Sequence, residues 1–380
     1  RLYLNDGRGR FTRAPAGALP TEGANGSRVA AADYDGDGDT DLFVGGRAVT
    51  GRYGVSGQSL LLVNDGRGRF TNATDARAPG LAGAGMVTDA AWHDTDGDGR
   101  PELVLVGEWM PVTVFHNAGG GRLARQAVRG LEASTGWWTR VVAADVTGDG
   151  RADLVLGNVG LNSRLHASDR EPVRLYVKDF DQNGITEQIL TCYNEGVDYP
   201  VPLRDDLIRA LPAWRARFPS YARYATQTVD SVLPPKERAG ALVREARTFA
   251  TSVARANADG SFTLAALPAE AQVAPVAGIV ARDLNGDGAT DLVLAGNFDG
   301  VRPEIGRLAA GRGLVLRGDG RGGFAPLPRA VGGFAAPGQT RDLAVVRSAG
   351  APLLVAARNN DRPLVYRLRP AGAAVARGLG

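Results

Sequence analysis

The stretch DYDGDGDTD, residues 33–41, places five aspartates among nine residues. Carboxylates this close together repel one another and destabilise a fold unless a cation or solvent neutralises them. Gly38, at the sixth position, permits the sharp turn that a ring of inward-facing carboxylates needs. The strand-type residues LFVGG follow the last aspartate at once. The stretch therefore predicts a cation-binding loop that leads directly into a β-strand.

The same frame returns four more times along the chain. It reads D-x-[DNT]-x-[DN]-G-x-x-[DE] and runs into an apolar segment each time. The later copies are DTDGDGRPELVLVG (94–107), DVTGDGRADLVLG (145–157), DFDQNGITEQIL (179–190) and DLNGDGATDLVLAG (283–296). A single copy is no more than an Asp/Gly turn. Five copies hold 18 of the 41 acidic residues, which favours a shared cation-binding role.

A second repeat alternates with the acidic loops. LYLNDGRGRFT (2–12) matches LLVNDGRGRFT (61–71), and looser copies lie at 114–123, 253–264 and 314–324. Each is an apolar strand, an Asn/Asp-Gly turn and a short second strand, which is typical of a β-hairpin. One unit thus contains four strands. Repeats of this kind predict an all-β chain, a β-propeller of six or seven four-stranded blades with a small α-helical insertion.

The spacing of the acids indicates the metal. Side chains at positions 1, 3 and 5, the carbonyl of position 7 and the acid at position 9 form an all-oxygen cage, which suits Ca²⁺ best. An EF-hand would need a glutamate at position 12 and a helix on each side. Here the last acid is at position 9 and a strand follows, so the EF-hand is excluded.

The predicted ligands define up to five calcium sites, with position 7 contributing only its carbonyl. Loops three to five carry fewer charges, so we expect weaker binding there. In order of the loops, the ligands are Asp33, Asp35, Asp37, Asp39 and Asp41; Asp94, Asp96, Asp98, Arg100 and Glu102; Asp145, Thr147, Asp149, Arg151 and Asp153; Asp179, Asp181, Asn183, Ile185 and Glu187; and Asp283, Asn285, Asp287, Ala289 and Asp291.

The composition is that of a globular protein. The chain has 380 residues, 44% hydrophobic and 22% charged, with a net charge of +3 and no apolar run long enough to span a membrane. Arginine far outnumbers lysine, a bias that indicates base composition of the genome more than a nucleic-acid surface. Because the chain begins with Arg1 inside a repeat, we expect it to be one propeller, residues 1–380, of a longer protein.

Residues 196–246 interrupt the repeats with helical spacing. We predict a helical insertion within the fourth blade, between its second and third strands, with the blade resuming near 249–264. Residues 204–255 contain ten basic and five acidic residues, which leaves open a polyanion-binding surface or a helical cap with solvated arginines. The last unit, 341–368, has strand-like segments but no acidic loop, so it is expected to be a metal-free blade.

No catalytic constellation is visible. His93, His116 and His166 have no paired spacing, so the sequence does not indicate a transition-metal site. The single cysteine, Cys192, lies in a strand-like segment and is expected to be a buried structural thiol. We therefore predict no catalytic residues and no cofactor other than calcium.

The acidic loops joined to N-D-G-x-G-x-F hairpins resemble FG-GAP/VCBS repeats, the calcium-loop repeats of integrin α-subunit propellers. The stretches at 107–117, 160–184 and 303–322 resemble bacterial exported proteins that combine such repeats with an ASPIC/UnbV domain and are similar to cartilage acidic protein. No ASPIC/UnbV segment is recognisable here. The resemblance implies a calcium-binding propeller located outside the cell, on its surface or in the periplasm of a bacterium.

The expected function is that of a binding or adhesion module for a glycan or a surface protein, which also contacts missing domains of its own chain; nucleic acid is an unlikely partner. The alternative is a propeller-type polysaccharide lyase or hydrolase, and a purely structural domain is a third possibility. An acid outside the loops that lines a pocket beside an arginine or tyrosine would favour an enzyme. Glu108, Glu195 and Glu304 are the candidates.

Overall fold

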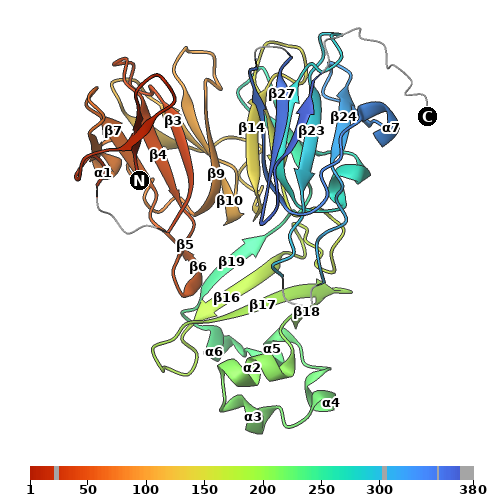
Figure 1. Cartoon of the computed structure of the whole chain (residues 1–380). Helices are drawn as coiled ribbons and strands as arrows, with labels where there is room; N and C mark the ends of the chain where they lie inside the picture. Colours follow the sequence, from red (N-terminus) through yellow and green to blue (C-terminus); the bar gives the residue numbers. More distant parts are fainter. Residues whose placement is uncertain (21–24, 302–305, 349–350, 369–380) are drawn as a thin grey trace. The chain divides into compact units, whose positions relative to one another are not determined.

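The computed structural model describes residues 1–20, 25–301, 306–348 and 351–368. The described chain is mostly β-strand with a few short helices (Figure 1), which confirms the predicted all-β class. It forms two compact units: Arg1–Ala127, Glu132–Gly136 and Ala167–Thr248 make the first, and Val128–Leu131, Trp137–His166 and Phe249–Gly380 make the second. A closed propeller and its number of blades remain predictions.

The first unit begins with two antiparallel sheets that contact one another through β3 and β9. Their inner faces share a core that includes Phe43, Leu61, Leu103 and Phe115. The first sheet has the order β3 (Gly26–Ala32), β4 (Asp41–Gly46), β7 (Leu60–Asn64), β8 (Phe70–Asn72), and the second contains β9 (Met86–His93), β10 (Glu102–Met110), β11 (Thr113–Asn117) and β12 (Leu123–Gln126).

The predicted hairpins at 2–12 and 61–71 form as β1–β2 and β7–β8. Their turns are closed by aspartates: Asp6 accepts a hydrogen bond from the Arg8 N–H at 2.8 Å, and Asp65 accepts one from the Arg67 N–H at 2.9 Å. The smaller elements nearby are β1 (Tyr3–Asn5), β2 (Phe11–Arg13), β5 (Ala48–Val49), β6 (Arg52–Ser56) and α1 (Thr74–Arg77).

A third sheet of the first unit carries the helices predicted between 196 and 246. The apolar stripe of Leu207, Leu211 and Phe218 packs with Tyr176 and Ile189 of the sheet. The sheet order is β18 (Val197–Pro200), β17 (Glu187–Asn194), β16 (Val173–Lys178), β19 (Leu242–Ala246), and the helices are α2 (Arg204–Ala210), α3 (Trp214–Arg217), α4 (Tyr221–Tyr224), α5 (Val229–Val232) and α6 (Pro235–Arg238). Cys192 lies in β17 and is half-buried, so it is less buried than expected.

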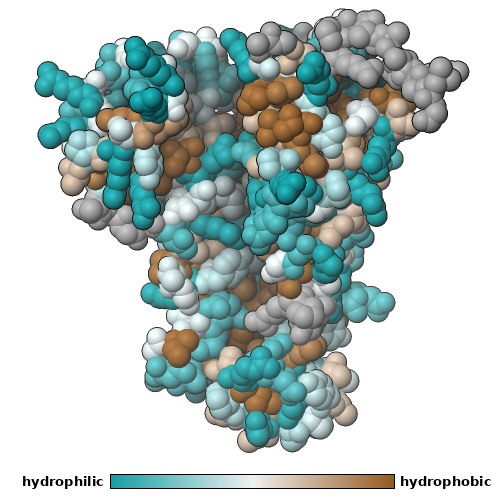
Figure 2. All heavy atoms as spheres, in the orientation of Figure 1, coloured by the Kyte–Doolittle hydropathy of each residue, from teal (hydrophilic) through white to brown (hydrophobic). Residues whose placement is uncertain are grey.

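The arginines of this helical segment have acidic neighbours. Arg217 pairs with Glu237 at 3.0 Å, and Arg238 pairs with Asp230 at 2.5 Å. The face of the helical segment seen in Figure 2 mixes hydrophilic and hydrophobic residues. Because several of its positive charges are matched locally, the segment resembles a helical cap more than a polyanion-binding surface.

The second unit contains three sheets whose first strands, β14, β22 and β26, lie next to one another in that order. The short strand β13 (Gly136–Trp137) pairs with β10. The sheets are β14 (Arg140–Ala144), β15 (Asp153–Gly157), β20 (Ser252–Ala256), β21 (Phe262–Ala266); β22 (Val276–Arg282), β23 (Asp291–Gly296), β24 (Leu314–Gly318), β25 (Phe324–Pro326); and β26 (Thr340–Val346), β27 (Leu353–Arg358), β28 (Leu364–Arg367), with η1 (Ala269–Gln272) and α7 (Arg329–Gly332) outside them.

The strand pairing corrects the predicted position of the insertion. Residues 249–264 were expected to resume the fourth blade, but β20 pairs with β15, with Leu154 opposite Ala254. They therefore complete the sheet that carries loop three. The fourth acidic loop belongs to the separate sheet of β16 to β19, in which β19 takes the edge beside β16. The inserted segment is thus residues 158–251, and its strands could not be assigned partners from local sequence alone.

A glycine recurs where the second strand of several sheets bends. A methyl group on Gly107 would lie 2.1 Å from the Met86 carbonyl oxygen, and one on Gly296 would lie 1.7 Å from the Pro275 carbonyl oxygen. The strand register shifts beside both residues. Gly46 and Gly157 are equally crowded, at 2.2 and 2.3 Å from backbone oxygens. Only glycine lets the neighbouring strand approach this closely.

Candidate cation-binding loops

Each acidic loop connects two neighbouring strands of one sheet. Loop one joins β3 to β4, loop two β9 to β10, loop three β14 to β15, loop four β16 to β17 and loop five β22 to β23. The acid at position 9 is the first residue of the second strand in every case. All five of these acids are buried: Asp41, Glu102, Asp153, Glu187 and Asp291.

The acid at position 1 shapes the loop. In loop one, Asp33 accepts hydrogen bonds from the N–H groups of Gly36 at 2.9 Å and Gly38 at 3.0 Å. Loop five repeats this pattern, and the N–H groups of Gly286 and Gly288 lower the pKa of Asp283. The position-1 carboxylates of loops one and five are therefore held by the backbone of their own loops.

The carboxylates converge in three of the loops. In loops one and two the acids at positions 1, 3 and 5 bring one oxygen each within 4.8 Å of the others, and in loop four the acids at positions 1, 3 and 9 do so. Loops three and five have the neutral side chains of Thr147 and Asn285 at position 3. The structure thus groups the predicted acids of loops one, two and four most closely.

Arginines lie beside several of these acids, which the sequence analysis did not predict. Arg77 donates to Asp35 of loop one at 2.6 Å. In loops two and three the position-7 residues Arg100 and Arg151 place their guanidinium groups on the position-5 acids, Asp98 and Asp149. A cation in these two loops would have to compete with a built-in positive charge.

Asp41 of loop one has the most unusual environment. Its Oδ1 accepts a hydrogen bond from the Asn64 N–H at 2.8 Å, but its Oδ2 is buried without a hydrogen bond of ordinary geometry. The pKa of Asp41 is raised to about 6, mainly by burial and also by the nearby Asp35 and Asp37. The N–H groups of Asn64 and Tyr34 partly offset this rise. A bound dication would supply a positive charge beside this buried carboxylate and neutralise it. Loop one therefore fits calcium.

The raised pKa of Asp41 predicts a pH dependence in calcium-free protein. Its folded pKa of about 6 exceeds the ordinary value of 3.8, so its contribution to stability is present below pH 4 and is lost as the pH rises past 6. The change amounts to up to about 3 kcal/mol. Urea unfolding of protein stripped of calcium beforehand, at pH 5 and pH 7, should show roughly half of this change. Asp41→Asn should reduce this difference in the free energy of unfolding between the two pH values. An equal difference in both proteins would contradict the assignment of the pH dependence to Asp41.

The position-9 acids of loops three and five are already satisfied by the fold. Asp153 accepts hydrogen bonds from the N–H groups of Val146 at 2.9 Å and Ala256 at 2.8 Å. Asp291 accepts from the N–H groups of Leu284 at 3.1 Å and Gly318 at 3.0 Å. These acids hold the loop to the third strand of the sheet, and weaker calcium binding there stays a prediction.

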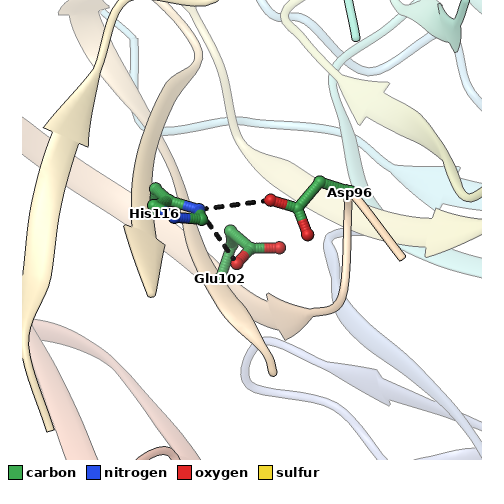
Figure 3. A group of neighbouring side chains, drawn as sticks. All are labelled: Asp96, Glu102 and His116. Atoms are coloured by element: carbon green, nitrogen blue, oxygen red, sulfur yellow. Dashed lines mark ion pairs between the residues drawn. The ribbon is translucent and has the colours of Figure 1, made fainter. Parts of the chain in front are cut away.

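Loop two gains a neighbour from the next strand. Figure 3 shows His116 of β11 with its ring nitrogen pointing at Asp96 and Glu102. The distances from His116 Nδ1 are 3.2 Å to Asp96 Oδ2 and 3.5 Å to Glu102 Oε1. Sequence reasoning missed this contact because it comes from strand register: Leu103 pairs with Phe115, which leaves Glu102 and His116 opposite one another.

Of the three acids proposed as signs of an enzyme, Glu108 lies beside both an arginine and a tyrosine. Arg47 pairs with it at 2.5 Å and the Tyr53 hydroxyl donates to it at 3.0 Å. The next residue, Trp109, helps to line a hollow of about 550 Å³ together with Thr135, Arg244, Arg247 and others. Glu195 lies exposed in a turn, and Glu304 lies outside the described residues.

Comparison with known proteins bears out the repeat. The family model described as FG-GAP-like repeat matches residues 1–44 and 94–156, which include loops one, two and three. These loops and the four-stranded units around them define a β-repeat protein. Residues 1–44 and 94–156 of the chain are FG-GAP-like repeats. Its closer resemblance to proteins with an ASPIC/UnbV domain stays a prediction.

No curated protein sequence matches the chain. Among solved structures, the V. cholerae biofilm matrix protein Bap1 is 13% identical over 90% of this chain and 77% of that chain, with a TM-score of 0.30. BBS1N in complex with ARL6DN is 10% identical over 91% of this chain and 93% of that chain, with a TM-score of 0.27. At these TM-scores neither structure says what this chain binds.

Within the residues described, no helix combines the length and the apolar character needed to cross a bilayer.

Proposed function

We propose that this chain is a calcium-stabilised binding module that works outside the cell and takes a glycan or a surface protein as its ligand. The observation that carries the proposal is loop one. There, three carboxylates converge, and the position-9 carboxylate of Asp41 is buried with its Oδ2 lacking a hydrogen bond of ordinary geometry. The FG-GAP-like repeats support the same function.

The residues of loop one would hold calcium through oxygen atoms alone. Asp33, Asp35, Asp37 and Asp41 would supply carboxylates, and Asp39 its carbonyl. Bound calcium would supply positive charge and fix the loop against the start of β4. Calcium in loops three, four and five would act in the same way, with lower affinity where arginine or neutral side chains replace free carboxylates.

The test is a matched pair of aspartates. Asp37 and Asp65 each accept a hydrogen bond from the N–H two residues later, at 2.9 Å, but only Asp37 belongs to an acidic loop. Asparagine preserves that bond and removes the charge. Asp37→Asn is expected to weaken the tightest calcium site at least ~10-fold by calorimetric titration of EGTA-stripped protein, because affinity follows ligand charge. Asp65→Asn should titrate like the wild type, and identical curves for all three would contradict the proposal.

The ligand side is tested with the calcium-loaded chain on a glycan array, repeated in EGTA. Calcium-dependent binding to one glycan class would support the proposal. We would place that ligand in the hollow beside Trp109, which Arg244 also lines. Arg244 donates to the Gly54 carbonyl and to Ser56 Oγ, and neither partner neutralises its positive charge, which could therefore attract a polar ligand. Arg244→Ala should then abolish the array signal and leave the calcium titration unchanged.

The alternative, a lyase or hydrolase, would use Glu108 with Tyr53. Burial raises the pKa of Tyr53, and the nearby Glu108 raises it further, so the phenol stays protonated. Glu108 is held by Arg47, which joins the β5–β6 hairpin to β10. This arrangement gives Glu108 a structural role, and binding remains the function that we propose.

A further inference from the structure

We propose that loop two binds a transition-metal dication of the zinc type, and not calcium, through His116, Asp96 and Glu102. This inference rests on the proposed function only in treating loop two as a cation site. It does not depend on calcium binding at the other four loops. It adds a nitrogen ligand that no calcium loop of this frame contains.

Two of the separations between the ligand atoms are close to those around a small tetrahedral metal. Zinc bonds to nitrogen and oxygen are about 2.0–2.2 Å long, which places tetrahedral ligands roughly 3.3–3.6 Å apart. His116 Nδ1 lies 3.2 Å from Asp96 Oδ2 and 3.5 Å from Glu102 Oε1. Calcium takes oxygen ligands at about 2.3–2.6 Å, and imidazole nitrogen suits zinc and its neighbours instead.

One of the three ligands, Glu102, is held in place before any metal arrives. Glu102 is fully buried, and its Oε2 accepts hydrogen bonds from the Thr95 N–H at 2.7 Å and the Thr95 hydroxyl at 3.0 Å. These contacts leave Oε1 directed at His116. The Nδ1 atom of His116 is itself buried without a hydrogen bond of ordinary geometry. Outer contacts of this kind orient metal ligands and fix their protonation state.

The site also has access to solvent. The side chain of Asp96 is 42% exposed and that of His116 is 32% exposed. A metal can therefore enter from that side and keep water in its fourth position.

The calcium ligands predicted for loop two are engaged elsewhere. The guanidinium group of Arg100 covers Asp98 at position 5, and Asp96 at position 3 faces His116. Asp94 and Asp98 keep the backbone contacts of their counterparts in loop one: Asp94 accepts from the N–H groups of Gly97 and Gly99, and Asp98 accepts from the Arg100 N–H at 2.8 Å. The guanidinium group of Arg100 and the imidazole of His116 thus make loop two less suited to calcium than to a metal that accepts a nitrogen ligand.

The strand register shows that the histidine is particular to loop two. The residue opposite the position-9 acid on the third strand is Val63 beside loop one, Arg255 beside loop three and Arg317 beside loop five. None of these offers a metal ligand. His116→Val therefore gives loop two the valine that loop one has at this position. His166 is exposed and far along the chain, and it provides a control histidine.

The experiment uses the EGTA-stripped full chain, with Zn²⁺ and Co²⁺ as probes. We expect one zinc per chain, competed by Co²⁺ with visible d–d absorption. His116→Val should weaken zinc binding at least ~10-fold, since even loss of an outer-shell partner costs 10–100-fold. His166→Val should bind like the wild type. Asp37→Asn should lose its calcium site and keep the zinc site, which separates this inference from the proposed function.

Imidazole ¹⁵N spectra of the wild type provide a readout that needs no variant. Coordination should shift Nδ1 of His116 on zinc addition. Zinc binding that survives His116→Val, an unshifted Nδ1, or loss of zinc in a His93→Val variant instead would each overturn the proposal.

Discussion

Removal of calcium with EGTA is expected to lower the melting temperature of this protein by on the order of 10 °C. A site at one hundred times its dissociation constant contributes about 2.7 kcal/mol to stability. Two such sites would contribute about 5 kcal/mol, and each kcal/mol is worth roughly 2–4 °C in a domain of 150–250 residues. The effect is large because the carboxylates that converge in loops one and four repel one another without a cation, and these loops lead directly into β4 and β17.

The measurement is a thermal melt in EGTA followed by melts with calcium or magnesium restored. Calcium should recover the lost stability and magnesium should not, because magnesium demands a small octahedral site and keeps its waters. Zinc is withheld, so that loop two does not contribute. If EGTA leaves the melting temperature unchanged, none of the five loops is a structural calcium site.

The second large effect is expected from Gly296→Ala, which should destabilise the protein by about 3 kcal/mol or more. A methyl group there would lie 1.7 Å from the Pro275 carbonyl oxygen and 2.6 Å from its carbon. The strand cannot move away cheaply, since the same oxygen accepts the Asn297 N–H at 3.0 Å. Overpacking of a buried site costs 1–3 kcal/mol, and a lost backbone hydrogen bond adds to it.

Urea unfolding measures this change, and Gly83→Ala is the control. A methyl group on Gly83 meets no atom within 4 Å, so that variant should stay within about 0.5 kcal/mol of the wild type. Equal stability of the two variants would show that the strand register at Gly296 is not as tight as described.

The acidic loops could be predicted because their chemistry is local. A carboxylate at position 1, a glycine at position 6 and an apolar run after position 9 lie within a dozen residues, and Asp33, Gly38 and Asp41 lie where that frame predicts. The arginines could not be placed in the same way. Arg77 reaches Asp35 from a helix some forty residues away, and only the folded sheet brings them together.

Strand pairing across long separations explains the remaining errors. Nothing in the residues 249–264 distinguishes β15 from β17 as their partner, because every second strand of the repeat is a similar apolar run. His116 was set aside for the same reason. Its position in the sequence has no metal-binding pattern, and its contact with Glu102 comes from the β10–β11 ladder.

The placement of residues 158–251 between β15 and β20 has a consequence for biosynthesis. When β15 leaves the ribosome, its hydrogen-bonding partner is still about 95 residues from being made. At roughly 5–20 residues per second, that strand waits about 5–20 s with one edge unpaired. An apolar strand edge left open for that long is a template for misassembly. The yield of folded protein should therefore depend on translation speed and chaperone supply more than the stability of the finished sheet suggests.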